Sequence, residues 1–537
     1  MSTANLTKFL KLLLVIVLLK SIVWSLLIPL WHFPDEQAHF GHVAFNVEIQ
    51  RYQRQGKNDL TEEIAISEKL LGTFRDEHGN NRFTYHPEYN LDYTQTLTGI
   101  YENEIKSLPS GMRGNFVAQE SAYYPELFYN LSGFIYKTFY QANLFIRVFT
   151  IRLAWLPLLL IIIWSGFKIT RVIFPKDKHL SLLVALMVGF HPMLSFVSSG
   201  ISSDNLYNAL FSLMILASTL LIIRGFSLPL VLGLGVITGL GMNTKPQFLI
   251  SLAIILPALI ISIFKKINRK NYWKIVLGIL LFLGLSFVFG GRTRIKIFLN
   301  SWNTGKLFSF FRLKNKILLP DYSLIDHVIW TIKHTIREVA PWYWGVFRWL
   351  SLVLPRWVNR VLNRLVLIAV VGVIIKLLRV IKDKKLKNNQ GFIFLIYTVF
   401  IYFTALTVWD WSFFRTNNFS FGIQGRYYFP VIIPQMILLS LGIKEIFGLF
   451  GKIAAKLSLI ILSLWFIILN FIALYTVASS YYNIANLKIF IIQASQYKPF
   501  FAKGNWLIGV LMLYLIASLI FIWKLSRIVL KQIKNEK

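Results

Sequence analysis

The chain has 537 residues, of which 55% are hydrophobic and only 15% are charged. A soluble domain averages about 25% charged residues, so this composition indicates an integral membrane protein. A dozen membrane helices of about 20 residues would take roughly 240 residues, which excludes a single-anchor enzyme and leaves room for a large extramembrane segment. Because the sequence has no cysteine, disulfides, thiolate metal sites and cysteine nucleophiles are excluded as well.

The net charge of +33 is unevenly distributed along the chain. Fifteen of the 24 acidic residues lie between Asp35 and Glu126, a segment that has only eight Lys and Arg. Elsewhere the basic residues cluster at the ends of apolar runs, where they would meet lipid headgroups. The distribution therefore predicts membrane lipids as partners and argues against nucleic acid.

The apolar runs predict an all-α polytopic membrane protein with about 12 transmembrane helices. The first run has a basic start but lacks a small-residue cleavage site, so we expect an uncleaved anchor. The expected spans are residues 9–30, 146–167, 180–199, 205–224, 228–243, 247–264, 274–291, 361–381, 391–409, 429–447, 457–478 and 506–525.

Basic residues follow the second, sixth, eighth and twelfth expected spans, which all end on one side if the spans alternate. The positive-inside rule makes that side cytoplasmic, with both termini in the cytosol and the protein in the cytoplasmic membrane. The chain then divides into a first anchor, an extracytoplasmic loop with amphipathic helices, a group of spans, an outer interfacial segment and a second group of spans with two outer loops. These parts are residues 1–30, 31–145, 146–291, 292–360 and 361–537, with outer loops 410–428 and 479–505.

The outer segment 292–360 mixes basic residues with apolar and aromatic ones, which is typical of amphipathic helices lying in the headgroup plane. Its first basic residues are Arg292, Arg294, Lys296, Lys306, Arg312, Lys314 and Lys316. The two halves of the chain show no internal repeat, which counts against secondary transporters built from repeats.

A distinctive motif follows the first expected span. Pro34 breaks the helix where it leaves the bilayer, and Asp35, Glu36 and His39 come directly after it. A carboxylate at this boundary can act as a general base for a hydroxyl, and we expect Asp35 to do so with Glu36 as its catalytic neighbour. The alternatives are a helix N-cap at Asp35, or a divalent cation held by these carboxylates with His39 and His42.

Two further polar positions interrupt the apolar runs. Asp204 follows two serines in a tight outer connection, where it either caps the next helix or orients an acceptor or a cation. Lys245 lies between two short spans, where it either holds a phosphate or extends to the lipid headgroups.

The last motif is in the outer loop 410–428. Asp410 and Arg415 open the loop, and Arg426 and Tyr427 close it just before the tenth span. Arginine presents a planar fork of donors that suits phosphate oxygens. The alternative is a structural ion pair between Arg426 and Asp410.

These blocks, in this order, resemble an uncharacterised multi-pass family of predicted bacterial membrane proteins that is placed near the GT-C glycosyltransferases. The resemblance rests on Phe33-Pro34-Asp35-Glu36 with His39, on His191-Pro192 with Ser203-Asp204-Asn205, on Thr244-Lys245-Pro246 and on Gln424 to Pro430. Ser121 to Pro125, followed by Arg147 to Leu153, is also similar to a GT-C pattern.

The resemblance implies a GT-C-like fold, in which the long first outer loop packs with later loops into a module above the bundle. It also implies a polyprenyl-phosphate-linked sugar donor, an inverting displacement, Asp35 as base, and Lys245 and Arg426 as ligands of the departing phosphate. The acceptor would be a hydroxyl on a glycan, lipid or protein. No cofactor is expected, because the sequence has no nucleotide-binding motif and no clear multi-ligand metal motif.

We therefore expect a glycosyltransferase acting on the outer face of the membrane. Asp35 and Glu36 are its expected catalytic residues, and the expected substrate-binding residues are His39, Asp204, Lys245, Asp410, Arg415, Arg426 and Tyr427. Two other functions remain open: a transporter or flippase of lipid-linked saccharide, and a non-catalytic assembly protein that uses the acidic loop to bind a partner.

Overall fold

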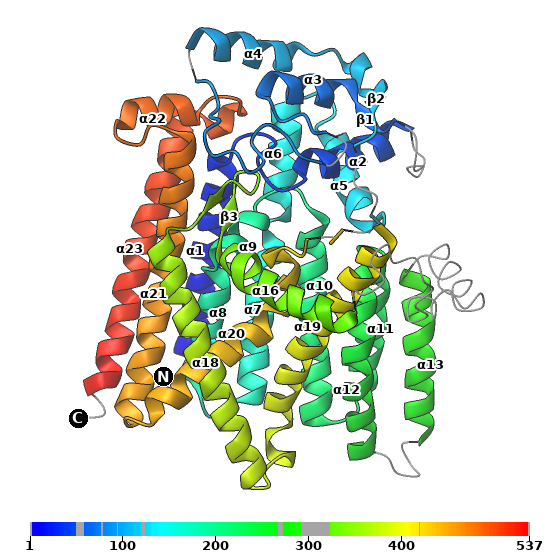
Figure 1. The fold of residues 1–537 in the computed structure, drawn as a ribbon, viewed down its shortest axis with the longest axis vertical. Helices are drawn as coiled ribbons and strands as arrows, with labels where there is room; N and C mark the ends of the chain where they lie inside the picture. The colour runs from blue at the N-terminus through cyan, green and yellow to red at the C-terminus, as the bar shows by residue number, and fades with distance from the viewer. Residues whose placement is uncertain are drawn as a thin grey trace.

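The computed structural model describes residues 3–49, 58–76, 79–93, 95–120, 124–266, 272–290, 323–417, 419–420 and 422–534. Its fold is almost entirely helical, with two short antiparallel strand pairs, and confirms the all-α membrane class (Figure 1). The expected amphipathic residues 292–322 and the expected motif residues Ser121, Ala122 and Tyr123 lie outside the described part of the chain.

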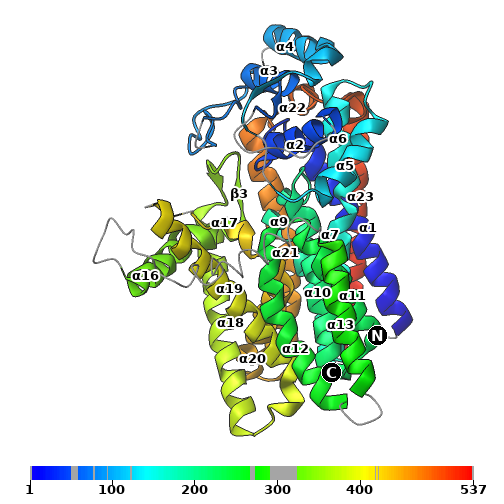
Figure 2. The same cartoon turned by 90° about the vertical axis from the view of Figure 1, so that its right-hand side faces the viewer.

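The bundle consists of long helices that run side by side in Figures 1 and 2. They are α1 (Thr3–Leu27), α6 (Leu144–Trp155), α7 (Pro157–Ile173), α8 (Lys178–Gly189), α10 (Ser203–Arg224), α11 (Leu228–Met242), α12 (Ile250–Lys266), α13 (Tyr272–Phe289), α18 (Arg356–Lys382), α19 (Gln390–Asn417), α20 (Ile432–Gly448), α21 (Lys452–Tyr481) and α23 (Gly504–Lys534).

Nine helical segments of the described chain are long and apolar enough to cross a membrane. α6 and α7 together form one of them, Leu144–Ile173. Of the three other expected spans, 180–199 falls on α8 and the short α9 (Pro192–Val197), 228–243 falls on the short α11, and 361–381 falls within α18. The protein is thus a multi-pass membrane protein.

A module covers one end of the bundle and is built mainly from the acidic segment that follows α1 (Figure 1, top). Its elements are α2 (Glu36–Ile49), β1 (Leu60–Thr61), α3 (Glu62–Leu71), α4 (Gln95–Ser107), β2 (Phe116–Ala118) and α5 (Leu127–Thr138), with α22 (Leu487–Ala494) beside them. β1 and β2 pair in antiparallel fashion, with Leu60 opposite Ala118. Both chain termini lie towards the other end of the bundle (Figure 1).

Local signals explain several boundaries of the module. Thr61 caps α3 by accepting a hydrogen bond from the backbone N–H of Ile64 (3.4 Å), and Gly72 ends the helix in the left-handed conformation. Asn143 caps α6 in the same way. Two ion pairs then fasten the module to the bundle: Glu63 of α3 pairs with Arg147 of α6 in a buried contact, and Glu102 of α4 pairs with the partly exposed Lys503 beside α23.

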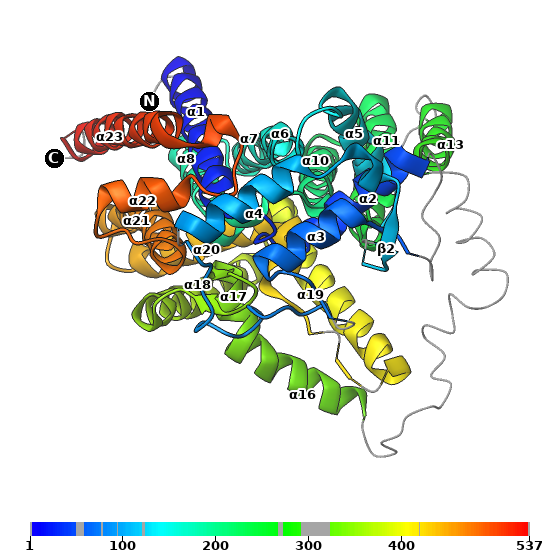
Figure 3. The same cartoon turned by 90° about the horizontal axis from the view of Figure 1, so that it is seen from above.

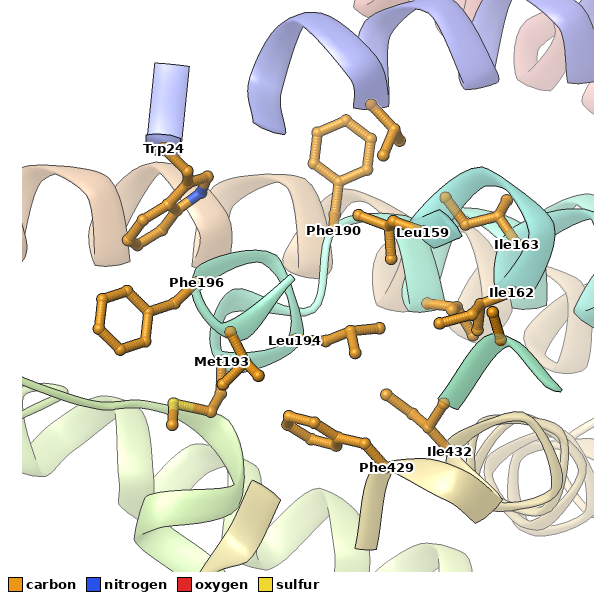
Figure 4. Packing of buried hydrophobic residues seen from close by; sticks show 14 of the residues in the cluster. Trp24, Leu159, Ile162, Ile163, Phe190, Met193, Leu194, Phe196, Phe429 and Ile432 are labelled. Atoms are coloured by element: carbon orange, nitrogen blue, oxygen red, sulfur yellow. The ribbon is translucent and has the colours of Figure 1, made fainter. Parts of the chain in front are cut away.

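The core of the bundle lies where α1, α7, α9 and the start of α20 meet. Figure 4 shows the side chains of Trp24, Phe196, Met193 and Phe429 lying around the short helix α9. Trp24 and Phe196 are in edge contact, with ring centroids 6.0 Å apart. Gly372 and Gly442 allow α18 and α20 to pack closely, because a Cβ on Gly372 would lie 2.0 Å from the carbonyl oxygen of Gly442.

The described part of the expected interfacial segment crosses the direction of the bundle. α16 (Leu324–His334) leads through η3 (Thr335–Val339) to α17 (Ala340–Trp344) and the strand pair β3 (Val346–Phe347) and β4 (Leu352–Val353). α16 lies transverse to the long helices in Figure 2, and Figure 3 shows it beside α19 at the edge of the molecule. This segment brings α17 against η5 (Gly425–Val431), which carries the last of the predicted motifs.

Candidate active site

The turn between α1 and α2 positions the first predicted residue. Trp31 and Asp35 both adopt left-handed backbone conformations, with φ of 63° and 54°. Aspartate tolerates this conformation better than most residues, and such strain is concentrated at functional sites. The backbone carbonyl of Asp35 accepts a hydrogen bond from the N–H of His39 (3.0 Å), while its carboxylate is bound by arginines from outside the turn.

Two arginines hold the carboxylate of Asp35. Arg426 donates to Oδ2 at 2.8 Å and Arg75 donates to Oδ1 at 3.3 Å. Burial opposes ionisation of Asp35, but Arg426 and Arg75 outweigh it and hold the pKa of the carboxyl well below its usual range. The Asp35 side chain remains 39% exposed while each arginine side chain is only 9% exposed, so the carboxylate is the accessible member of the cluster.

Arg75 was not predicted from the sequence. It follows α3 in the acidic segment and also binds Glu120, through Nε to the carboxylate and through a second nitrogen to the backbone carbonyl (2.9 Å). Glu120 is itself fixed because its N–H donates to Asp59 at 2.9 Å, beside the β1–β2 pair. One basic residue among many charges on a polar loop gives no local signal, so only the folded loop identifies it.

Arg426 reaches Asp35 from the other end of the sequence. It lies on η5, where Gly425 allows the backbone to pass α17, because a Cβ on Gly425 would lie 2.2 Å from the backbone nitrogen of Tyr343. Tyr427 stands next to it, with its ring centroid 5.6 Å from the guanidinium carbon of Arg426. The alternative of an ion pair between Arg426 and Asp410 is wrong, since Arg426 pairs with Asp35.

A second ion pair joins Asp204 and Lys245. Lys245 Nζ lies 2.5 Å from Asp204 Oδ1 and 4.3 Å from the ring centroid of Tyr124. Ser202 caps α10 by accepting from the N–H of Asp204 (3.2 Å), so capping falls to the serine and the aspartate is left to bind the lysine. Burial opposes the charge on Lys245, but Asp204 outweighs it and raises the pKa of the ammonium. Lys245 is 8% exposed, and its ammonium group is paired with Asp204.

His39 lies close enough to both ion pairs to be affected by their charges. Its Nδ1 lies 2.8 Å from the hydroxyl of Tyr129, its Nε2 lies 3.4 Å from the hydroxyl of Ser202, and its ring stacks on Tyr124 at 5.9 Å between centroids. Burial, reinforced by the charge of Lys245, lowers the pKa of His39 to about 3. The imidazole is therefore neutral at physiological pH, with one ring nitrogen donating and the other accepting.

Glu36 occupies a different environment from its neighbour. Both of its carboxylate oxygens bind Arg152, one of them at 2.7 Å from Nε, and both side chains are fully buried. Arg152 also donates to the backbone carbonyls at the end of α1 and just beyond it, which belong to Ser25, Ile28 and Pro29. The contacts of Glu36 are those of a structural clamp between α1, α2 and α6.

The four side chains considered for a metal do not converge. Asp35 faces two arginines, Glu36 faces Arg152, His39 faces Tyr129, and His42 stacks on that tyrosine at 3.7 Å between ring centroids. Within the described ranges, no group of three or more His, Asp or Glu side chains is arranged to hold a metal ion.

The other two predicted binding residues lie in a separate cluster. Asp410 is fully buried, accepts hydrogen bonds from the hydroxyl of Ser420 at 2.9 and 3.0 Å, and lies 3.2 Å from Nε2 of His327. Arg415 stands over the ring of Trp411, 5.6 Å from its centroid. This second cluster joins α16 to α19, whereas Asp35, Asp204, Lys245 and Arg426 meet at the base of the module.

Structural comparison returns solved structures at low similarity. ArnT from Cupriavidus metallidurans in the apo state is 13% identical, with 92% of this chain and 74% of that chain covered and a TM-score of 0.36. The archaeal oligosaccharyltransferase AglB from Archaeoglobus fulgidus is 14% identical, with 89% of this chain covered and a TM-score of 0.45. This chain spans little more than half of AglB, at 56%. These TM-scores are too low to carry over a fold, an activity or a site residue.

Sequence comparison is more decisive. No curated protein matches the chain. Residues 18–434, which are well over half of the chain, match the family described as "Predicted membrane protein (DUF2142)". This matched region contains Asp35, Asp204, Lys245 and Arg426. The chain therefore belongs to this family of predicted membrane proteins.

Proposed function

We propose that the protein is a membrane glycosyltransferase that moves a sugar from a polyprenyl-phosphate-linked donor to an acceptor hydroxyl. The observation that carries this proposal is the ion cluster in which Asp35 meets Arg426 across 391 residues, with the Lys245–Asp204 pair close by. The cluster combines an accessible carboxylate with several buried cations at the junction of the membrane bundle and the module. A base and a phosphate site are the two functions that such a transfer requires.

The donor phosphate is assigned to Arg426 and Lys245. Arg426 offers a planar fork of donors, and its Nε lacks a hydrogen-bond partner among the described residues. The Nζ of Lys245 faces the ring of Tyr124 and forms an ion pair with Asp204. A phosphate oxygen can replace the carboxylate of Asp204 in this ion pair. Because a polyprenyl chain cannot leave the bilayer, cations near the ends of membrane helices suit this substrate. Tyr427, Asp204 and His39 are assigned to positioning these groups.

Asp35 is assigned as the general base. The acceptor hydroxyl oxygen forms a bond to the anomeric carbon, the bond from that carbon to the phosphate oxygen breaks, and the hydroxyl proton moves to Asp35. The polyprenyl phosphate leaves with the bonding electron pair, and Arg426 and Lys245 stabilise its charge. A single displacement of this kind inverts the anomeric configuration.

Competition between Asp35 and the donor phosphate for Arg426 explains how a carboxyl of low pKa can serve as a base. In the free protein, Arg426 is occupied by Asp35. A bound phosphate would draw Arg426 away, which raises the pKa of the Asp35 carboxyl and makes it more basic only when donor is present. Glu36 is assigned a structural role, because Arg152 occupies both of its oxygens.

The test is transfer activity in proteoliposomes with a panel of polyprenyl-phosphate hexoses and pentoses. Release of polyprenyl phosphate is the measurement, because it does not require a known acceptor beyond a mixture of candidate hydroxyl compounds. We expect Asp35→Asn to reduce release by about 10²- to 10⁴-fold while the protein still inserts and elutes normally. Glu104→Gln, which changes an exposed acid on α4 of the same module, is the matched control and should leave release unchanged.

Two outcomes would overturn the proposal. Full release with Asp35→Asn would remove Asp35 as the base. Movement of the lipid-linked sugar across the bilayer without release would identify a flippase instead.

The proposed side of the membrane can be tested separately, because the chain has no cysteine of its own. Ser110→Cys in the module should react with an impermeant thiol reagent added outside intact cells, whereas Lys384→Cys at the other end should not.

A further inference from the structure

The hairpin formed by β3 and β4 contains an unusual run of backbone conformations. Arg348, Trp349 and Leu350 follow one another in its turn, and all three are left-handed, with φ of 51°, 51° and 63°. A Cβ disfavours this conformation, so turns of this kind are usually built from Gly, Asn or Asp. Other residues keep it only where the surrounding structure enforces it. The contacts of these three residues therefore indicate what the turn is held against.

Buried polar contacts hold the turn in place. Arg348 is only 4% exposed, and its guanidinium donates to the backbone carbonyl of Ser480 at the end of α21 (3.0 Å) and to Oδ1 of Asn90 (2.9 Å). The hydroxyl of Ser351 donates to the backbone carbonyl of Arg348 (2.6 Å) within the turn itself. The hairpin is thus fixed between the bundle and the acidic segment, and Figure 2 shows it rising from α17 towards the module.

Trp349, in the middle of this turn, contacts the turn that carries Asp35. Its indole N–H donates to the backbone carbonyl of Trp31 (3.1 Å), and its own carbonyl accepts from the N–H of Tyr85 (3.1 Å). Trp31 and Tyr85 are themselves left-handed, with φ of 63° and 62°. Six of the eight left-handed residues other than glycine in the described chain therefore lie in three segments that Trp349 joins. Backbone strain is concentrated where the hairpin meets the turn before Asp35.

The other end of the same segment contacts the helix that carries Arg426. Tyr343 of α17 packs against η5 directly beside Arg426. Its hydroxyl donates to Oε1 of Gln435 (2.6 Å), which fastens α17 to α20, the helix that follows η5. One continuous segment, residues 340–353, therefore contacts the chain close to both members of the Asp35–Arg426 pair.

We propose that residues 340–353 form a bridge that sets the separation of Asp35 and Arg426. Trp349 is the positioning residue at the hairpin end of the bridge, because it holds the carbonyl of Trp31 four residues before Asp35. The α17 end holds Arg426 in the same way, through the start of α20. The proposal rests on the proposed function, in which Asp35 takes the proton of the acceptor hydroxyl. Such a base must be placed accurately, because small displacements of reacting groups slow a reaction strongly.

The two ends of the bridge should give different kinetic effects. Trp349→Phe removes the indole donor but keeps an aromatic ring, so it should displace Asp35 and leave the phosphate ligands in place. We expect kcat for release of polyprenyl phosphate to fall about tenfold, with the KM for the lipid-linked donor unchanged. Tyr343→Phe removes the hydroxyl contact at the other end, and we expect KM to rise about fivefold while kcat changes less. A general loss of stability would not divide the two constants in this way.

The matched control is Trp155→Phe. This change removes another buried indole donor, which is bonded to the hydroxyl of Ser132 (3.0 Å) and lies outside the bridge. It should leave kcat and KM unchanged. The wild type and the three variants are compared at equal amounts of folded protein, measured by thermal unfolding in detergent.

Hydrogen–deuterium exchange of the full-length protein in detergent tests the bridge without an activity assay. The N–H of His39 donates to the carbonyl of Asp35 (3.0 Å), so its exchange reports on the turn. We expect residues 31–40 to exchange about tenfold faster in Trp349→Phe than in the wild type, because the turn opens more often without its indole contact. Trp155→Phe should exchange like the wild type over the same residues.

Unchanged exchange over residues 31–40 in Trp349→Phe would overturn the proposal, as would the same change in kcat and KM for Trp349→Phe and Tyr343→Phe. Equal effects of Trp155→Phe and Trp349→Phe would overturn it too, because they would show a response to any lost buried donor. If the wild type released no polyprenyl phosphate, the proposed function would fail instead, and the exchange measurement would still decide whether Trp349 holds the turn.

Discussion

Asp35 and Glu36 are adjacent acids that each pair with arginine, and yet their surroundings differ completely. Glu36 and Arg152 are both fully buried and bind each other through both carboxylate oxygens. The carboxylate of Asp35 binds two arginines, its backbone is in the left-handed conformation, and 39% of its side chain is exposed. The buried Glu36–Arg152 pair has no accessible group that a substrate could contact. The exposed Asp35 carboxylate can contact a substrate and can lose one of its arginines to it. Accessibility, and not residue type, thus separates the structural clamp from the candidate site.

The clamp should show the largest effect on stability. Arg152→Leu leaves a buried carboxylate unpaired and removes the donor from three backbone carbonyls. We expect a loss of about 3–5 kcal/mol in the free energy of unfolding, measured by thermal unfolding in detergent. Arg356→Leu, at the exposed start of α18, should unfold like the wild type. If the two variants have equal stability, Arg152 is not a clamp.

The affinity for the donor should depend on Arg426 of the candidate site and not on an arginine outside that site. Arg426→Lys keeps the charge but loses the planar fork, so we expect the KM for the lipid-linked donor to rise about tenfold and kcat to fall less. Initial rates over a range of donor concentrations measure both constants. Arg415→Lys changes an arginine in the separate Asp410 cluster and is expected to leave both constants unchanged. An equal effect of the two substitutions would contradict the division into two clusters.

Lowering the pH should destabilise the folded protein through His39. Burial, with the charge of Lys245 adding to it, lowers the pKa of His39 to about 3 in the folded protein, while an unfolded histidine has a pKa of about 6.5. Between these values the unfolded chain binds more protons, so stability falls as the pH drops below 6.5. Asp35 has a lowered pKa and contributes no change in this range.

The measurement is the difference between wild type and His39→Gln in the free energy of unfolding at pH 6.5 and pH 5. We expect the wild type to lose about 1–2 kcal/mol more than the variant over this interval. Parallel pH dependence in the two proteins would show that His39 is not held neutral by burial.

The smallest effect is expected for the stability of Asp35→Asn. Its ion pairs are partly exposed, and such pairs contribute about 0–1 kcal/mol. Thermal unfolding should therefore show a change of less than about 1 kcal/mol, in contrast to Arg152→Leu. If Asp35→Asn unfolded the protein, Asp35 would have a structural role like that of Glu36.

Much of the candidate site could be predicted because polar residues stand out at the ends of apolar runs. Asp35, Asp204, Lys245 and Arg426 were identified in this way, and the structure brings all four together. Arg75 could not be identified, because its surroundings in the sequence are already rich in charges. The role of Glu36 could not be identified either, because its partner Arg152 lies 116 residues away and only folding reveals the pair.

The fold was predictable to a similar degree. Hydrophobicity alone places the long helices, but it cannot tell a complete span from a short buried helix such as α11, since both are apolar. The transverse direction of α16 and its contact with α19 depend on packing between segments far apart in the sequence.

The 391 residues that separate Asp35 from Arg426 have a consequence for biosynthesis. Ribosomes add about 5–20 residues per second, so the aspartate emerges roughly 20–80 s before the arginine that completes its surroundings. During that interval the nascent chain already occupies the membrane but lacks the arginine to which we assign the donor phosphate. Under the proposed function, the late arrival of Arg426 would keep a half-made chain from engaging the cell's pool of lipid carriers.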